Sequence, residues 1–460
     1  MGEVVSNSTR ISVIISASLA GLLFGFDTAV ISGVTGSLVD VYSLSPAGKG
    51  AAVSAALWGT LTGALLIGRP GDRFGARNVL RLVGILYVVS AIGCALAVNL
   101  ASFVGFRFIA GLAIGGSSVL APVYISEIAP AKRRGALVGL FQFNIVFGIL
   151  AAYCSNFVIG RLLPGPHSWR WKLAAAALPA LVFCVLLVRI PHSPRWLLVK
   201  GRVREAARSF HRLGASDPQA AVQELEQWNA SHLATGDARL SWTLHRRPIL
   251  LAVTIAMFNQ LSGINAILYY LGDIFSAAGF SALSADLQSV AIGLTNLAAT
   301  LVGMSIIDRV GRKTLLLIGS VGTGLALAGV AAVMISGREQ GLLLWLLIGF
   351  ISFFALSQGA VIWVYMSEVF PTAVRARGQS LGSATHWMMN ALISGVFPVI
   401  AARSQGAPFV FFAAMMVLQL IVVARLFPET KGVGLEQMED VVANRVHESS
   451  AQGRSSKAQI

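Results

Sequence analysis

The chain has 460 residues, of which 55% are hydrophobic and only 12% are charged, and its formal net charge is +15. Soluble domains carry about a quarter charged residues, so this composition excludes an ordinary soluble enzyme and indicates a membrane protein. The positive charge does not by itself indicate nucleic-acid binding, because such a protein needs a soluble domain with clustered cations and aromatic side chains, which this sequence does not contain.

Six apolar stretches follow one another in the first part of the chain. Each is close to the roughly 20 residues that a helix needs to cross a hydrocarbon core about 30 Å thick. They do not alternate apolar with polar positions as barrel strands do, so we predict helices. The first is too long for a signal peptide and has no small-residue cleavage site, so we expect it to be retained. The expected spans are 11–34, 51–68, 79–98, 102–125, 135–160 and 173–189.

A polar segment, residues 191–247, separates these spans from six more. Within it, Val203–Leu213 and Gln219–Trp228 have helical spacing, which favours short amphipathic helices over a disordered connector. The later spans are expected at 249–276, 286–307, 314–335, 342–366, 378–400 and 408–427. We therefore predict an all-α membrane protein of twelve transmembrane helices. Its parts are an N-terminal bundle (1–190), the linker (191–247), a C-terminal bundle (248–427) and a tail (428–460).

The 35 Lys and Arg residues are divided unevenly between the loops. Counted from a cytoplasmic N-terminus, six lie in outer loops and Arg107 lies inside a span, while the others face the cytoplasm. Cytoplasmic loops of membrane proteins carry an excess of Lys and Arg, so the asymmetry predicts that both termini are cytoplasmic. The six outer cations are Lys49, Arg161, Arg170, Lys172, Arg338 and Arg403.

The same two motifs occur in both halves of the chain. GRPGDRFGAR (68–77) follows the second span and GMSIIDRVGRK (303–313) follows the eighth. SEIAPAKRRG (126–135) follows the fourth span and SEVFPTAVRARG (367–378) follows the tenth. Equivalent motifs at equivalent positions predict two six-helix bundles related by an axis along the membrane normal.

These motifs place acids and arginines together at the cytoplasmic helix ends. Alternating access requires contacts that form in one state and separate in another, and ion pairs at the membrane surface suit this purpose. The alternative is that these basic loops only hold the topology. The candidate gate residues in these motifs are Asp72, Arg73, Glu127, Arg134, Asp308, Arg312, Glu368 and Arg375, and the family resemblance given next adds Arg195.

Further motifs make the chain resemble a known family. They are FGFDTAVISG (24–33), PHSPRWL (191–197), NQLSGINAILYY (259–270) and PETKG (428–432). In this order around twelve spans, they are similar to those of the sugar porters of the major facilitator superfamily. The resemblance covers nearly the whole chain and implies a two-bundle, monomeric carrier with short intracellular helices. His192 departs from it, because the family usually has Glu there in its cytoplasmic charge network.

Asp27 and Arg107 are ionisable residues inside predicted spans, where an unpaired charge is costly. In the bacterial proton symporters that this chain resembles, an Asp and an Arg at these positions pair, whereas passive facilitators typically have Asn in place of the acid. Burial raises the proton affinity of a carboxylate and a nearby guanidinium lowers it, so such a pair forms a switch. Asp27 therefore favours proton coupling, and a static structural ion pair is the alternative.

A sugar presents many hydroxyls, so its pocket needs amides, hydroxyls and aromatic faces. Residues matching sugar-contacting positions of the family supply them, although interhelical hydrogen bonding and packing are alternatives for each. They are Phe24, Gln142, Asn259, Gln260, Asn265, Tyr269, Asn296, Trp363, His386, Trp387 and Asn390. Asn259 is one methylene shorter than the Gln that the family usually has there. A His at position 386 is similar to the fructose-type animal facilitators. These two departures make a ketose or an unusual hexose conceivable as the substrate.

The resemblance implies proton-coupled uptake of a hexose or pentose across a bacterial inner membrane, with the sugar, the proton and membrane lipid as partners. A passive facilitator is the alternative; a sugar sensor is disfavoured by the short tail, and a drug efflux antiporter by the motifs. We expect no enzymatic activity, cofactor or metal. Cys94, Cys154 and Cys184 lie far apart in apolar helices without metal-ligand spacing, so we expect buried, unreactive thiols.

Overall fold

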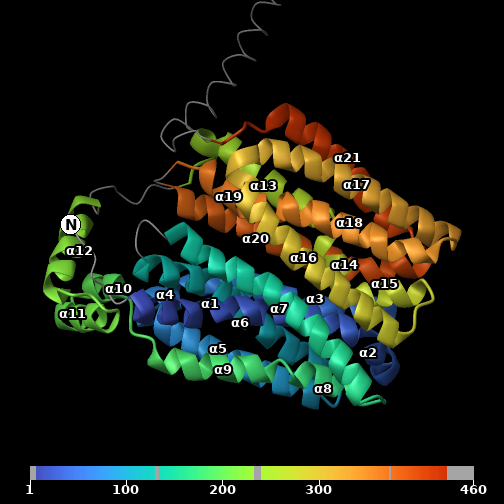
Figure 1. Ribbon diagram of the computed structural model, residues 1–460, viewed down its shortest axis with the longest axis horizontal. Helices are drawn as coiled ribbons and strands as arrows, with labels where there is room; N and C mark the ends of the chain where they lie inside the picture. Colours follow the sequence, from blue (N-terminus) through green and yellow to red (C-terminus); the bar gives the residue numbers. More distant parts are fainter. Residues whose placement is uncertain (1–6, 130–133, 233–239, 372–373, 432–460) are drawn as a thin grey trace, which may run out of the picture. The chain divides into compact units, whose positions relative to one another are not determined.

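The computed structural model describes residues 7–129, 134–232, 240–371 and 374–431, and in these ranges every regular element is a helix. Residues 432–460 of the predicted tail lie outside the described residues, as does Arg133 of the second motif. The helices of the first part of the chain are α1 (Asn7–Val30), η1 (Ile31–Gly33), α2 (Thr35–Tyr42), α3 (Pro46–Leu66), α4 (Gly68–Phe74), α5 (Ala76–Leu96), α6 (Leu100–Ile128), α7 (Arg134–Leu162), α8 (Ser168–Ala174) and α9 (Ala177–Arg189) (Figure 1).

The polar segment contains three short helices, two of which lie where helical spacing predicted them. They are α10 (Pro194–Val199), α11 (Val203–Arg212) and α12 (Pro218–His232). The later helices are α13 (Trp242–Leu261), α14 (Ile264–Tyr269), α15 (Leu271–Ala277), α16 (Ala282–Val310), α17 (Arg312–Ser336), η3 (Gln340–Leu342), α18 (Leu343–Leu356), α19 (Gln358–Glu368), α20 (Arg375–Arg403) and α21 (Ala407–Leu426).

The helical spans agree with the sequence prediction. Among the described residues, eleven stretches are long and apolar enough to cross a membrane, and the bent pair α3 and α4 makes twelve. The predicted seventh span, 249–276, is broken into α13, α14 and α15. The predicted class, an all-α protein with twelve apolar spans, is confirmed.

By their internal contacts, the residues form two compact units. Unit 1 comprises Met1–Ala234, Asn265–Leu297 and Asn390–Arg403, and unit 2 comprises Thr235–Ile264, Ala298–Met389 and Ser404–Ile460. Stretches of the second half of the chain thus pack with the first half in unit 1. The bundle boundaries at 190 and 248 stay a prediction.

Glycines allow the helices of unit 1 to approach closely. A Cβ atom at Gly25 on α1 would lie 1.9 Å from the backbone oxygen of Ile145 on α7. At Gly111 on α6 it would lie 1.9 Å from the backbone oxygen of Ala56 on α3. Small residues serve the same purpose where membrane helices cross, because lipid supplies little hydrophobic drive for their association.

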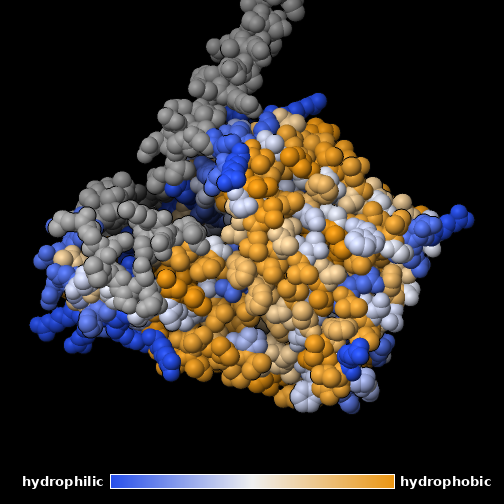
Figure 2. All heavy atoms as spheres, viewed as in Figure 1, coloured by the Kyte–Doolittle hydropathy of each residue, from blue (hydrophilic) through white to orange (hydrophobic). Residues whose placement is uncertain are grey.

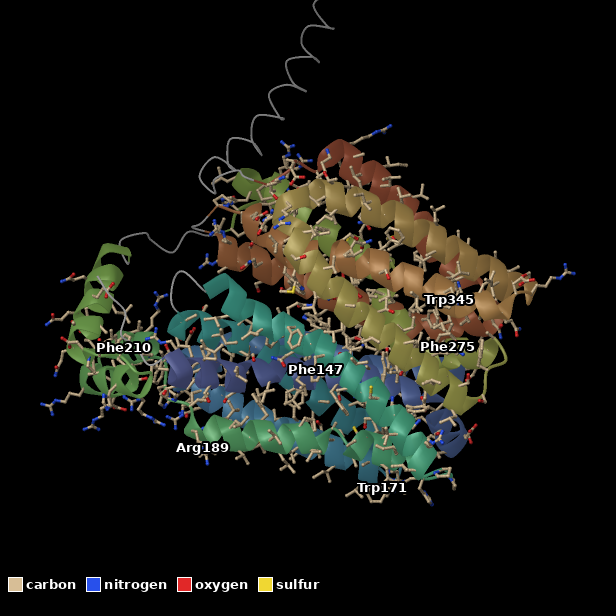
Figure 3. The ribbon with its side chains drawn as sticks, viewed as in Figure 1. Phe147, Trp171, Arg189, Phe210, Phe275 and Trp345 are labelled. Carbon is tan, nitrogen blue, oxygen red and sulfur yellow. The ribbon has the colours of Figure 1, made fainter. Side chains whose placement is uncertain are left out.

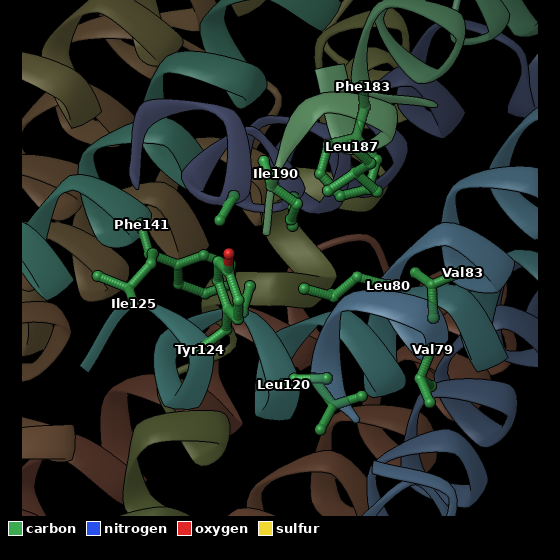
Figure 4. Close-up of a cluster of buried hydrophobic side chains, with 14 of the residues drawn as sticks. Val79, Leu80, Val83, Leu120, Tyr124, Ile125, Phe141, Phe183, Leu187 and Ile190 are labelled. Carbon is green, nitrogen blue, oxygen red and sulfur yellow. The ribbon is translucent and has the colours of Figure 1, made fainter. Parts of the chain in front are cut away.

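The core of unit 1 lies between α1, α5, α6, α7 and α9 (Figure 4). Tyr124 is fully buried there, and its hydroxyl donates a 2.7 Å hydrogen bond to the backbone oxygen of Pro191, just beyond α9. Leu120 and Leu187 belong to the same cluster. This hydrogen bond therefore holds the start of the polar segment against α6.

Large apolar side chains remain exposed along the helices of both units. Leu178 on α9 in unit 1 and Leu325 on α17 in unit 2 are each 71% exposed. Figure 2 shows apolar atoms along the sides of the helices and hydrophilic atoms gathered near helix ends. Such a surface is expected where lipid, rather than water, surrounds the helices.

Candidate functional site

Asp27 on α1 and Arg107 on α6 form a buried ion pair in unit 1. Arg107 Nη1 lies 2.8 Å from Asp27 Oδ1 and 2.9 Å from Oδ2, and the two side chains are 13% (Asp27) and 4% (Arg107) exposed. Arg107 Nε is also buried and has no hydrogen-bond partner among the described residues. The structure thus brings together the two residues predicted to couple sugar transport to the proton.

Several predicted sugar-binding residues lie in unit 1. Asn390 Nδ2 donates to the Tyr269 hydroxyl at 3.3 Å, and Ser394 Oγ donates to Asn390 Oδ1 at 3.1 Å. The Thr28 side chain, next to Asp27 in the chain, also approaches the Tyr269 hydroxyl. A line of polar contacts therefore leads from the helix that carries Asp27 to Tyr269 and Asn390. Asn296 is buried, and Phe24, Gln142 and Asn265 are partly exposed.

The other predicted sugar-binding residues lie in unit 2, around His386 on α20. Gln260 Nε2 lies 3.1 Å from Asn259 Oδ1 and 3.2 Å from each nitrogen of the His386 ring. The His386 ring centroid lies 5.2 Å from that of Trp363 and 5.2 Å from that of Trp387. Trp363 is 38% exposed, whereas the other four are buried.

A break in the seventh span separates Asn259 and Gln260 from Asn265 and Tyr269 along the chain. Gly263 has a φ of +80°, a left-handed conformation that residues with a side chain rarely adopt. A Cβ atom there would lie 2.3 Å from Cδ2 of Phe412. Glycine is therefore required by both the backbone and the packing, and it ends the helix that carries Gln260 before α14 begins.

In unit 2 the predicted gate residues form a connected network. Arg312 Nη2 lies 2.9 Å from Asp308 Oδ1 and 2.8 Å from Glu368 Oε1. Thr430 Oγ1 donates to Glu368 Oε2 at 2.6 Å. Glu429, which the sequence analysis did not select, accepts the backbone N–H groups of Arg312 at 2.9 Å and Lys313 at 3.0 Å.

Two further backbone N–H groups, from Thr430 and Lys431, also donate to Glu429. Burial opposes ionisation of this carboxyl, but the four backbone donors outweigh it and hold the pKa of Glu429 below its ordinary value. Gly311 makes this possible, since its φ is +101° and a Cβ there would lie 2.7 Å from Glu429 Oε2. The PETKG motif thus closes the turn between α16 and α17.

The matching residues of unit 1 are arranged differently. Asp72 and Arg73 are exposed, and among the described residues neither forms an ion pair. Glu127 interacts with Ser193 and lies near Arg195.

Two candidates stand at helix starts. Arg134 begins α7, but its side chain lies outside the described residues. Arg375 begins α20 and has a buried Nε atom. Among the described residues, the ion pairs of the predicted gate lie around Arg312 in unit 2.

Sequence reasoning missed two ion pairs in unit 1, one between α8 and α16 and one between α3 and α15. Lys172 Nζ lies 2.7 Å from Asp286 Oδ2, with both side chains 9% exposed, and donates to the Gly33 backbone oxygen at 3.1 Å. Lys49 Nζ lies 2.7 Å from Asp273 Oδ1. The sequence analysis counted the two lysines only as charges of the outer loops. The signal that could have revealed the pairs is the presence of Asp273 and Asp286 within the predicted seventh and eighth spans.

Comparisons with known proteins agree with this architecture. Residues 13–442 match the family described as "Sugar (and other) transporter". The chain belongs to this family of the major facilitator superfamily. This sugar transporter is 33% identical to the D-xylose-proton symporter of Escherichia coli K12, over 95% of this chain and 97% of that protein. It is 34% identical to the arabinose-proton symporter of Bacillus subtilis, over 94% of this chain and 96% of that one.

Solved structures give the same result for the fold of this sugar transporter. The inward-open conformation of the E. coli xylose transporter XylE matches with a TM-score of 0.83 and 32% identity, over 94% of this chain and 99% of that one. Its partially occluded inward-open conformation matches with a TM-score of 0.82 and 32% identity, over 93% and 100%. The predicted family resemblance and the predicted fold class are both confirmed.

Proposed function

We propose that this protein takes up a monosaccharide together with a proton by alternating access. The observation that carries the proposal is the buried Asp27–Arg107 pair, because a pair so placed must change its hydrogen bonding when the carboxylate is protonated. The xylose and arabinose relatives, both named as proton symporters, support the same function.

In the proposed cycle, ionised Asp27 holds Arg107. A proton that enters neutralises Asp27, weakens its contact with the guanidinium and frees Arg107 to take other partners. Tyr269 contacts Thr28 and Asn390 in unit 1, and Thr28 follows Asp27 in the chain. Protonation of Asp27 therefore alters the positions of residues that we propose bind sugar hydroxyls. Sugar and proton then favour the same rearrangement, which is the requirement for coupling.

The proposed sugar-binding residues are the amide, hydroxyl and indole groups described above, with Gln260 as the central donor. Amides both donate and accept, as sugar hydroxyls do, and the exposed Trp363 ring offers a face for sugar C–H groups. We also propose a monomer in contact with lipid in a bacterial inner membrane, with both termini cytoplasmic. The protein acts as a carrier and not as an enzyme.

A passive facilitator is the competing function, and alkalinisation separates the two. Sugar is added to de-energised cells or vesicles that contain the protein, and the external pH is recorded. Symport predicts a rise in external pH with each transported sugar, whereas a facilitator leaves the pH unchanged. Competition of uptake by glucose, galactose, fructose and xylose then identifies the substrate.

A further inference from the structure

A group of arginines surrounds His192 in unit 1, where the polar segment begins. We call Arg77 and Arg81 on α5, Arg202 before α11 and Arg212 at its end the arginine cluster. Arg77, Arg202 and Arg81 lie near enough to His192 for their charges to act on its ring, and Arg212 acts in the same way on Arg77. Figure 3 shows Arg189 at the end of α9, on the side of unit 1 where α10 and α11 lie.

The cluster has more positive charge than nearby acids neutralise. Arg202 is paired with Glu205, at 2.7 Å and 2.6 Å. Arg81 donates to the backbone oxygens of Leu187 at 3.0 Å and Val188 at 2.8 Å, which satisfies hydrogen bonds but cancels no charge. Arg212 likewise donates to the backbone oxygen of residue 189 at 2.8 Å. In the described ranges no carboxylate pairs with Arg81 or Arg212, so two charges are uncompensated there.

Arg77 adds a third charge. In the described part of the chain no carboxylate forms an ion pair with it, and its Nε atom is buried without a hydrogen-bond partner. Glu127, on the neighbouring helix α6, interacts instead with Ser193 and Arg195. The Tyr124 hydroxyl is already committed to the backbone oxygen of Pro191. A buried guanidinium nitrogen without an acceptor is unfavourable, so an acceptor is missing here.

His192 stands at the centre and cannot supply the missing negative charge. Burial and the charges of Arg77, Arg202 and Arg81 lower the pKa of His192 to about 4, so the ring is neutral at pH 7. Its Nδ1 atom is buried and also has no partner among the described residues. The ring is held by stacking on Trp196 at 5.3 Å between centroids. As far as the structure describes the chain, two buried nitrogen atoms without partners and three arginines without ion pairs thus share one small region.

The helices beside the cluster expose apolar side chains. Leu82, next to Arg81, is 55% exposed, and Val185 and Val188 on α9 are 61% and 67% exposed. Basic pockets beside lipid-facing helices suit the phosphate of a lipid headgroup whose acyl chains cover the apolar surface. A phosphate also has several acceptor oxygens, which several guanidinium groups can share.

We propose that Arg77, Arg81 and Arg212, next to His192, bind a phosphate-bearing anion that supplies the negative charge this region lacks. The exposed apolar surface of α5 and α9 favours the headgroup of an anionic membrane lipid over free phosphate as the source.

The test titrates the purified, delipidated full-length protein in detergent with phosphatidylglycerol, with phosphatidylcholine and with inorganic phosphate. Bound lipid is counted by native mass spectrometry, and the melting temperature is recorded in parallel. We expect phosphatidylglycerol to bind and to raise the melting temperature more than phosphatidylcholine does. If inorganic phosphate alone reproduces the rise, the same anion site is supported with a soluble ligand. Equal effects of the two lipids would overturn the proposal.

Variants locate the site. Arg77→Gln should weaken phosphatidylglycerol binding about fivefold to tenfold, as expected for loss of one cation at a lipid headgroup. His192→Glu places a carboxylate among the arginines and should weaken it at least as much, while His192→Gln, which adds no charge, keeps it. Arg338→Gln removes an exposed arginine in the turn after α17 and is the matched control. Binding by Arg77→Gln and His192→Glu at the level of Arg338→Gln, or equal loss in His192→Gln and His192→Glu, would contradict the proposal.

Discussion

At the scale of single residues, Gln260 is the amide that we propose binds the sugar, which would share or replace its present hydrogen bonds. Its Nε2 atom lies within 3.2 Å of both Asn259 Oδ1 and the His386 ring, so the amide is already oriented before sugar arrives. The flanking Trp363 and Trp387 rings restrict how His386 can move. Preorganised polar groups bind a ligand at a lower entropic cost.

Replacement of Gln260 by Leu should therefore weaken sugar binding at least tenfold. The variant removes hydrogen bonds to the sugar, each worth about 0.5 to 1.5 kcal/mol net, and leaves His386 without its amide partner. The concentration dependence of sugar exchange in proteoliposomes measures the change. Gln288→Leu is the matched control, since among the described residues that amide donates to Ser284 on its own helix. Equal affinities in the two variants would rule out Gln260 as a sugar contact.

Glu429 gives a prediction about pH. Its folded-state pKa is depressed by four backbone donors, so ionised Glu429 stabilises the fold above the ordinary pKa of a glutamate, and this contribution is lost as the pH falls through the depressed value. Glu429→Gln should lower the melting temperature at pH 7, and the difference from the parent protein should shrink towards pH 3. A difference that stays constant over this range would show that Glu429 is not the titrating group.

At the scale of elements, the break between α13 and α14 depends on one glycine. Gly263→Ala should destabilise the protein by about 2 kcal/mol or more, because alanine is strained at positive φ and its Cβ meets the Phe412 ring. Thermal unfolding in detergent measures the effect. Gly349→Ala on α18 is the control, since nothing lies within 4 Å of a Cβ there. Equal melting temperatures would contradict the account of the break.

The Lys172–Asp286 pair joins α8 to α16, two elements far apart in the chain. Lys172→Met should cost roughly 3 to 5 kcal/mol, because it leaves the buried Asp286 carboxylate unpaired. The double variant with Asp286→Asn should recover much of this loss. Lys49→Met provides the comparison, since that pair is 18% and 26% exposed and is expected to contribute about 0 to 1 kcal/mol. A Lys172→Met loss no larger than that of Lys49→Met would contradict the argument from burial.

At the scale of the whole molecule, hydropathy and duplicated motifs were enough to predict the fold class. The twelve apolar stretches and the glycine turns follow from local composition and spacing. Gly75 and Gly311, in equivalent motifs, indeed both have positive φ, +82° and +101°. Two of the three short helices of the polar segment, α11 and α12, followed from their periodicity.

The sequence did not predict which side chains from distant segments form ion pairs. Nothing in the sequence near Lys172 indicates Asp286 as its partner, because contacts between distant segments depend on helix packing. Likewise, the motif spacing predicted equivalent gate pairs in both halves, but the described ion pairs occur around Arg312, where Glu429 and Thr430 fold back onto the turn.

The most direct test of the account is transport by the Asp27→Asn variant in proteoliposomes. Purified parent protein and variant are reconstituted and compared for sugar exchange at equal pH and for accumulation driven by an imposed pH gradient. We predict that the parent protein does both, whereas the variant exchanges sugar but no longer accumulates it. Accumulation by Asp27→Asn at the level of the parent protein would contradict proton coupling through the Asp27–Arg107 pair.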